Sequence, residues 1–237
     1  MSQDPHSAGR GMFHELDIKL EEFRGRAADP QVIGRYELIL STEWASNDCR
    51  MDGVSAALLG QAIENHQNAT ALLMSGSEND PPVFPNIKEV HAMMMEGLSE
   101  EAGDFRVGPV PLLSADHQPP EPGAIEAAIR RLEEWTAADS FLELHPIQQT
   151  ALVLVRLLDI HPFTDGNPRT CRVMANSCLI RAVFPPAIFL LAEASQYQQA
   201  MEAGLAMDTT QLTSQIARSV ARTLNYCLTG TFKSPVT

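Results

Sequence analysis

The sequence has no hydrophobic stretch long enough to cross a bilayer, for which about 20 predominantly apolar residues are needed. Its most apolar run, residues 178–192, is interrupted by Arg181, Pro185 and Pro186. Residues 1–10 also lack the hydrophobic core of a secretory signal peptide. We therefore expect no membrane among the partners of this chain.

Positive charge is scarce, with 17 Lys and Arg residues against 30 Asp and Glu residues and a formal net charge of −13. Nucleic acids and anionic membranes bind positively charged surfaces. The charge therefore disfavours nucleic acid as the main partner, whereas it is compatible with a basic protein.

Cysteine motifs are absent too: Cys49, Cys171, Cys178 and Cys227 form neither a CxxC pair nor a zinc-ligand spacing. Reduced cysteines are typical of the cytoplasm, which is the expected compartment. Delivery by a dedicated secretion system leaves none of these signals and stays an open alternative.

The sequence does contain a series of helical patterns in a chain of 237 residues, of which 44% are hydrophobic. This composition is typical of a globular protein. Residues 1–11 are expected to form a disordered tail. Helices are predicted over residues 13–26, 54–74, 87–98, 124–137, 146–160, 173–183, 197–206 and 210–228, with one more after Asp29-Pro30 and N-caps at Asp29 and Asp208.

A compact polar segment, residues 161–172 with the sequence HPFTDGNPRTCR, separates two apolar helical stretches. Its Gly-Asn pair suits a tight turn, and Pro168 suits the first turn of a helix. A loop that leads into a helix N-terminus presents N–H groups and a positive dipole end, which attract phosphate. Arg169 and Arg172 are three residues apart, so they share a helix face and are placed to clamp two phosphates.

This segment resembles the Fic (Fido) signature, H-x-F-x-D/E-G-N-G-R-x-x-R, with Pro168 in place of the second glycine. The resemblance implies an all-α fold, a Fido-type helical bundle with a small β-hairpin flap. Residues 12–86 would form N-terminal helices, residues 87–187 the Fido core, and residues 188–237 the C-terminal helices.

The one β-like segment, residues 103–113, alternates in polarity and contains prolines, which suits an exposed edge or hairpin. It resembles the flap that in Fic proteins holds a target in extended form, a mode of strand addition. By this resemblance Val107, Val110 and Leu112 are the candidate target contacts.

The resemblance also implies a reaction, the transfer of AMP from ATP to a Ser, Thr or Tyr hydroxyl of a protein substrate. His161 would accept the hydroxyl proton, because imidazole titrates near neutral pH. Asp165 would hold Mg²⁺ between the phosphates, since a hard cation prefers oxygen ligands.

The nucleotide would be bound by Gly166, Asn167, Arg169 and Arg172, with the arginines on the β- and γ-phosphates. Pro168 removes one backbone N–H from this anion site, and losing such a donor typically costs about 10²–10³ in rate. Other transfers on the same fold stay open, by a Doc-like kinase or another nucleotidyl or phosphocholine-type transferase. Hydrolytic removal of AMP is a further alternative, as is an inactive module that binds a nucleotide or a protein. A homo-oligomer is also left open.

Many Fic proteins carry an inhibitory segment, S/T-x-x-x-E-G/N, whose glutamate pairs with the second motif arginine and obstructs the γ-phosphate. Two registers are candidates here. By position, residues 48–53 place Asp52, one methylene shorter than glutamate, before a glycine. By sequence match, residues 60–65 end in Ile-Glu-Asn, which makes Glu64 the second candidate. The third alternative is that no inhibitory motif is intact.

Overall fold

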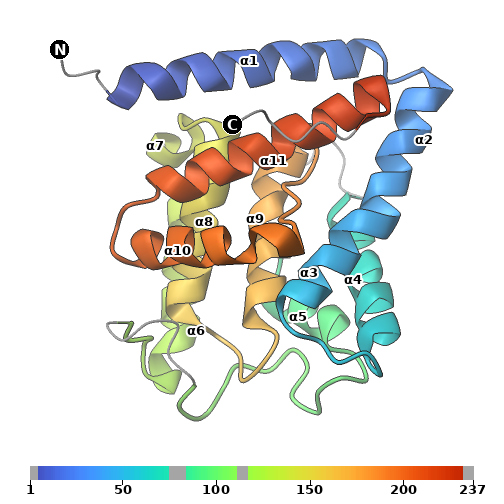
Figure 1. The fold of residues 1–237 in the computed structure, drawn as a ribbon. Coiled ribbons are helices and arrows are strands. Elements are labelled where there is room, and N and C mark those ends of the chain that lie inside the picture. The colour runs from blue at the N-terminus through green and yellow to red at the C-terminus, as the bar shows by residue number, and fades with distance from the viewer. Residues whose placement is uncertain (1–4, 75–83, 111–116, 232–237) are drawn as a thin grey trace.

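The computed structural model of the chain describes residues 5–74, 84–110 and 117–231. Within these ranges all regular structure is helical (Figure 1), which confirms the all-α fold class. The helices are α1 (Pro5–Gly25), α2 (Pro30–Ile39), α3 (Ala45–Met51), α4 (Leu59–Met74), α5 (Ile87–Met94), α6 (Ile125–Thr136), α7 (Asp139–Leu142), α8 (Pro146–Ile160), α9 (Asn167–Arg181), α10 (Ala194–Leu205) and α11 (Thr210–Thr229).

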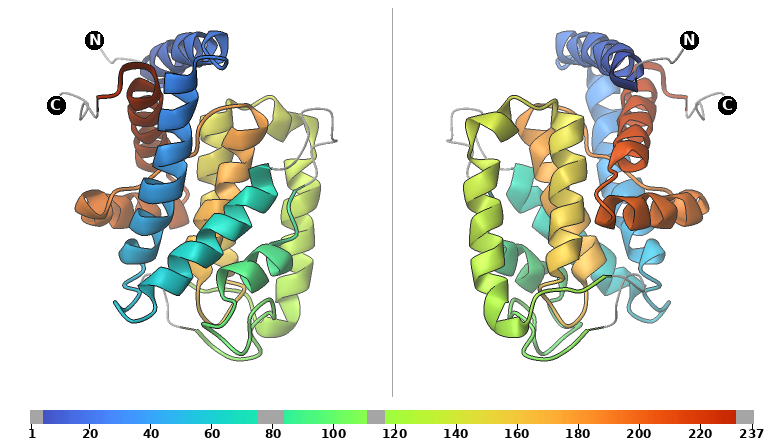
Figure 2. Two further views of the ribbon diagram at one scale, coloured as in Figure 1. Left: turned by 90° about the vertical axis from the view of Figure 1, so that its right-hand side faces the viewer. Right: turned by 90° about the vertical axis from the view of Figure 1, so that its left-hand side faces the viewer.

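The centre of the fold is the pair α8 and α9, which run side by side in opposite directions (Figures 1 and 2). α8 is buried on most of its circumference, through residues that include Val153, Leu154 and Leu157. A helix that is apolar nearly all round belongs in a core, where each such side chain contributes about 1.5–3 kcal/mol. The turn between the two helices contains the first half of the polar segment 161–172, so this segment is held at one end of the core.

The other end of α8 is fixed by His145. Its Nδ1 accepts the N–H of Ile147 at 3.2 Å, and Gln148 Oε1 accepts the N–H of His145 at 3.3 Å, which completes a capping box. The imidazole also stacks on Phe13 of α1 with 4.3 Å between ring centroids, and its Nε2 lies 3.2 Å from Asp17 Oδ1. His145 is therefore a structural residue that joins α1 to α8.

The remaining helices surround this central pair. α11 packs on α8 and is itself covered by α1, whereas α4 and α5 pack against α9 on another side (Figure 2). Among the described residues no helix is both long and apolar enough to span a membrane. The four cysteines are buried and free.

α2, a π-helical turn (Leu40–Trp44) and α3 follow one another without a break. The segment begins at Asp29, whose Oδ1 accepts the N–H of Gln31 at 2.9 Å, which confirms the predicted N-cap. It ends at Asp52, after which Gly53 takes a φ of +69° that favours glycine. The sequence analysis predicted no helix at α3, although this segment carries Asp52.

Some helix starts and one N-cap differ from the predictions. α1 begins at Pro5, so residues 5–11 are helical rather than part of a disordered tail. α4 begins at Leu59 instead of at residue 54. The N-cap of α11 is Thr209, and Asp208 Oδ1 instead accepts the N–H of Thr210 at 3.0 Å. Asp208 still satisfies one terminal N–H, which is why its sequence signal pointed to the correct helix end.

The predicted β-hairpin is not found in the described part of the flap, where residues 103–110 form bends without a strand. The side chain of Arg106 holds these residues in place by donating to the carbonyl oxygens of Gly108 and Pro120. Val107 is 90% exposed and Val110 is partly exposed. Leu112 lies outside the described residues.

Candidate active site

His161 follows α8 directly and ends it in the left-handed conformation, with a φ of +46°. Its N–H donates to Leu157 O at 3.0 Å. Arg106 donates from Nε to His161 O at 2.8 Å and from its backbone N–H to Pro162 O at 2.9 Å. These hydrogen bonds stabilise a conformation that residues other than glycine rarely adopt. The backbone that carries the imidazole is therefore fixed by the protein itself.

The imidazole of His161 is 7% exposed. Burial, with smaller contributions from His117 and Arg106, lowers the pKa of His161 to about 4. The ring is therefore neutral at pH 7 and able to accept a proton.

Asn167 closes the turn between α8 and α9. Its Oδ1 accepts the N–H of Phe163 at 2.9 Å, and its Nδ2 donates to Phe163 O at 2.7 Å. The side-chain amide is buried, and both of its polar atoms are used in these two bonds. Asn167 therefore shapes the turn through its side chain.

Gly166 precedes α9 with a φ of +71°, and a Cβ at this position would lie 2.5 Å from Met95 Sδ. Both the conformation and the close approach therefore require glycine. The N–H of Gly166 donates to Asp165 Oδ1 at 2.7 Å. Asp165 itself is exposed, so its second oxygen is available to a ligand.

Pro168 occupies the second position of α9, where the missing N–H would have had no partner inside the helix. The next N–H, that of Arg169, donates to Asp52 Oδ2 at 3.1 Å. A carboxylate of this chain therefore lies at the N-terminus of α9, where an anion is stabilised by the N–H groups and the helix dipole.

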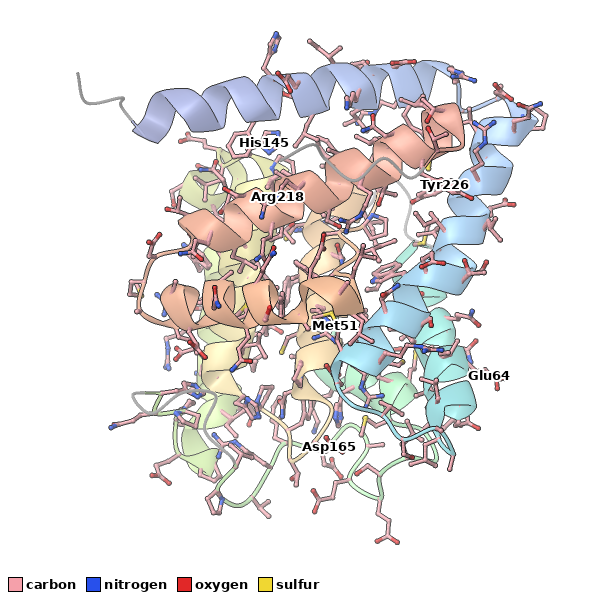
Figure 3. The ribbon with its side chains drawn as sticks, viewed as in Figure 1. Met51, Glu64, His145, Asp165, Arg218 and Tyr226 are labelled. Atoms are coloured by element: carbon pink, nitrogen blue, oxygen red, sulfur yellow. The ribbon has the colours of Figure 1, made fainter. Side chains whose placement is uncertain are left out.

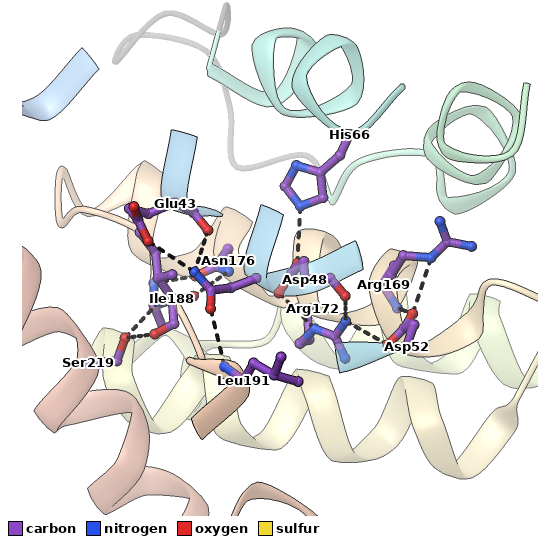
Figure 4. Close-up of polar contacts among 12 residues, drawn as sticks. Glu43, Asp48, Asp52, His66, Arg169, Arg172, Asn176, Ile188, Leu191 and Ser219 are labelled. Atoms are coloured by element: carbon purple, nitrogen blue, oxygen red, sulfur yellow. Dashed lines mark hydrogen bonds and ion pairs between the residues drawn. The ribbon is translucent and has the colours of Figure 1, made fainter. Parts of the chain in front are cut away.

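Two carboxylates from the end of α3 hold the two motif arginines (Figure 4). Asp52 Oδ1 accepts from Arg172 Nη2 at 2.8 Å, and Arg169 Nε lies 3.1 Å from Asp52 Oδ2. Asp48 Oδ1 accepts from Arg172 Nε at 2.9 Å, and Asp48 O accepts from Arg172 Nη2 at 3.0 Å. The second oxygen of Asp48 lies 3.1 Å from His66 Nε2. We call Asp48, Asp52, Arg169 and Arg172 the arginine clamp.

The two carboxylates of the arginine clamp differ in their environments. Asp48 is fully buried, which alone would raise its pKa, but the charges and hydrogen bonds of Arg172 and His66 outweigh burial and lower the pKa. For Asp52 burial outweighs Arg172 and Arg169, so its pKa is raised. The side chain of Asp52 is 10% exposed and lines the pocket described next, whereas that of Asp48 is fully buried, so Asp52 is the one of the two that a ligand can reach.

The arginine clamp borders a pocket of about 750 Å³. This volume lies within the range of about 300–1,000 Å³ that is usual for small-molecule sites. Its lining includes polar side chains, among them Asp165, Arg169 and Arg172, as well as apolar ones, among them Leu58 and Leu98.

The sequence of residues 84–179 matches the Fic/DOC family. The chain carries a Fic/DOC domain. The matched residues include α5, α6 and α8, most of α9, and the whole polar segment 161–172.

Curated relatives of this Fic/DOC chain are named protein adenylyltransferase Fic. The protein of Culex quinquefasciatus is 30% identical over 194 residues, which are 81% of this chain and 38% of the relative. That of Drosophila mojavensis is 33% identical over 151 residues, which are 63% of this chain and 30% of the relative. The chain therefore spans well under half the length of these relatives.

Solved Fic structures share the fold. Fic-1 of C. elegans superposes with a TM-score of 0.82 at 18% identity, over 95% of this chain and 73% of that one. A Fic domain containing signaling protein from Bacteroides thetaiotaomicron gives 0.78 at 16% identity, over 92% and 98% of the respective chains.

Of the two candidate inhibitory carboxylates, the structure brings Asp52 and not Glu64 to the arginines of the Fic motif. Glu64 lies on the exposed side of α4 and points away from the motif (Figure 3). Its neighbour Asn65 is buried and donates to Glu96 O at 2.8 Å, so the Ile-Glu-Asn string serves the packing of α4 on α5. The register by position is therefore the one that places a carboxylate beside Arg172.

Asp165 is the residue of the Fic motif that fits Mg²⁺. Among the described residues no group of three or more His, Cys, Asp or Glu side chains converges on one point. Mg²⁺ is usually held by one or two carboxylates together with substrate phosphates and water. Asp165 is a single exposed carboxylate, so it fits a cation for which other groups supply most of the ligands.

Sequence reasoning did not assign roles to Asp48, His66, His91 or Arg106, which all contact the motif or its clamp. One signal was available for Asp48, since it lies four residues before Asp52 and therefore on the same helix face. His91 approaches the motif only through tertiary packing, so no local pattern reveals it.

Proposed function

We propose that this chain transfers AMP from ATP to a hydroxyl group of a protein substrate. The observation that carries the proposal is the neutral, buried His161 placed at the same turn as an anion site with two arginines. The name of the curated relatives, protein adenylyltransferase, supports the same reaction.

In the proposed reaction His161 accepts the proton of the attacking hydroxyl. The hydroxyl oxygen forms a bond to the α-phosphorus, and the bond from that phosphorus to the β-phosphate oxygen breaks. The electron pair leaves with pyrophosphate, whose charge Arg169 and Arg172 would stabilise. His161 is suited to its role because its ring is already neutral and its backbone is fixed.

Mg²⁺, when bound, would neutralise charge on the phosphates. Asp165 would hold it with the oxygen that does not accept from Gly166. Pro168 has no backbone N–H to offer to the phosphates. The next backbone donor along α9 is the N–H of Arg169. That donor is the one that Asp52 occupies.

We further propose that Asp52 restrains the reaction. Its carboxylate is paired with both arginines that would bind the terminal phosphates, so ATP and Asp52 would compete for the same two cations. Replacing one anion by another leaves the buried guanidinium groups paired, which avoids the cost of an isolated buried charge.

The test of the proposed function uses ATP labelled at either the α- or the γ-phosphate, with the wild-type chain and its Asp52→Gly variant. We expect incorporation of α-label into protein, and its loss in Asp52→Gly/His161→Ala. Incorporation of γ-label instead would establish a kinase of the Doc type. Binding of ATP without incorporation of either label would establish a nucleotide-binding module without turnover.

A further inference from the structure

A second buried histidine, His91 of α5, contacts the Fic motif from outside it. Its ring is 2% exposed and stacks on Phe163, with 3.6 Å between the ring centroids and 3° between the ring planes. Its Nε2 lies 3.1 Å from Asp165 O, and its Nδ1 accepts the N–H of Gly103 at 2.9 Å. One imidazole therefore contacts the Asp165 turn and the beginning of the flap at the same time.

The hydrogen bonds of His91 determine its tautomer. A backbone N–H can only donate, so Nδ1 must carry a lone pair towards Gly103. The proton of the neutral ring is then on Nε2, from which it donates to Asp165 O. Both ring nitrogens are used in these contacts, so His91 is not free to move a proton in the reaction.

Each contact of His91 fixes a part of the site. The backbone held at Asp165 O belongs to the residue whose Oδ1 accepts from Gly166. Gly103 takes a φ of +87°, and a Cβ there would lie 3.0 Å from Ala92 Cβ, so the flap begins in direct contact with α5. Three residues later Arg106 donates to His161 O. His91 thus connects the flap to the carboxylate turn, and Arg106 connects the flap to His161.

We propose that His91 is a positioning residue that sets the Asp165 turn against the start of the flap. It acts through its two hydrogen bonds and not through its stacking alone. The inference rests on the proposed function for its catalytic consequence, but its structural part is independent of the reaction.

Two variants separate the hydrogen bonds from the stacking. His91→Phe keeps an aromatic ring on Phe163 and removes both bonds, whereas His91→Gln offers one acceptor and one donor in place of the two nitrogens. His145→Phe is the matched control, because His145 is also a stacked histidine with two polar contacts, and it lies at the opposite end of α8.

The first readout does not depend on activity. In the full-length wild-type chain, the ¹⁵N spectrum of His91 should show a proton on Nε2 and none on Nδ1. In His91→Phe the amide hydrogen of Gly103 should exchange about 10- to 100-fold faster, and His91→Gln should restore most of the protection. Equal exchange at Gly103 in His91→Phe and His145→Phe, or a proton on Nδ1, would overturn the proposal.

The second readout is the rate of α-label incorporation. Substituting a residue that orients a ligand-binding residue typically changes affinity or activity by about 10- to 100-fold. We expect a loss of that size in kcat for His91→Phe, with recovery in His91→Gln and no comparable loss in His145→Phe. A loss confined to the KM for ATP would overturn the positioning role. If no form of the chain incorporates label, the proposed function fails while the first readout still decides on His91.

Discussion

At His161 the candidate active site is held by hydrogen bonds to backbone carbonyl oxygens, whereas at Arg172 it is held by ion pairs with carboxylates. The hydrogen bonds at His161 involve backbone groups that a ligand in the site does not replace. An ion pair between an arginine and a carboxylate is exchangeable, because a phosphate presents the same kind of oxygen to the same cation. The comparison underlies two proposals made above, that His161 is ready to accept a proton and that Asp52 restrains the binding of phosphate.

The largest effect should come from the proton-accepting end. His161→Ala should lower AMP transfer by about 10²–10⁴-fold, the usual contribution of general base catalysis. ATP affinity should stay within a few-fold, because the phosphate-binding end is unchanged. Label incorporation and calorimetric ATP titration measure the two quantities. Unchanged transfer would remove His161 from the mechanism.

Pro168, which lies between the two ends, should have the next largest effect. Pro168→Gly restores a backbone N–H and should raise AMP transfer by about 10- to 10³-fold if that donor faces the transferred phosphate. The free energy of unfolding should fall by about 0.5–1 kcal/mol, since glycine is more flexible. Initial rates at saturating ATP and Mg²⁺ test this. A slower variant would show that proline suits another donor or orientation.

At the phosphate-binding end, Asp52→Gly should tighten ATP binding and raise transfer. Couplings between competing sites commonly amount to about 5- to 150-fold in affinity. Glu64→Gly is the matched control, because Glu64 is exposed and lies away from the arginines. ATP titrations of both variants give the comparison. Identical affinities in the two variants would rule out self-inhibition by Asp52.

Asp48→Asn should change ATP affinity less than Asp52→Gly does, and should lower the stability of the fold. Asn keeps a hydrogen bond to Arg172 but removes a buried charge, which should lower the free energy of unfolding by about 1–3 kcal/mol. ATP should bind more tightly than in wild type but less tightly than in Asp52→Gly. Urea unfolding and ATP titration measure both. Weaker ATP binding would mean that Asp48 prepares Arg172 for the nucleotide.

The smallest change is expected with pH. The pKa of His161 lies at about 4, below its ordinary value of 6.5, so the neutral base persists as pH falls from 8 to 5. The activity of Asp52→Gly should therefore change little over this range. A base with an ordinary pKa would lose about 30-fold by pH 5. A pH–rate profile of kcat/KM with an acid limb near 6.5 would contradict the burial of the ring.

The parts of the site that could be predicted are those that lie within one short segment. The order of His161, Asp165, Gly166 and the two arginines reflects a turn that enters a helix, and the structure has that turn. The helices on either side were also recognisable, because their apolar residues are continuous in sequence.

The rest depends on contacts that are distant in sequence. Asp52 and Glu64 each precede a residue that the inhibitory pattern allows, glycine or asparagine, and only the ion pair of Asp52 with Arg172 in the folded chain distinguishes them. The burial of Asp48 likewise depends on Arg172 and His66, which are distant from it in sequence. In the described part of the flap, Arg106 and not strand pairing fixes the conformation.

The position of Asp52 on the same chain as Arg172 has a consequence for the competition with ATP. A group tethered close to its partner acts at an effective concentration on the order of millimolar, whatever the concentration of the protein. Under the proposed competition, dilution would not release the arginines, and ATP would need a comparable concentration or affinity to bind them. The apparent affinity of the chain for ATP would then report how firmly the end of α3 is docked, which any event that loosens this helix would change.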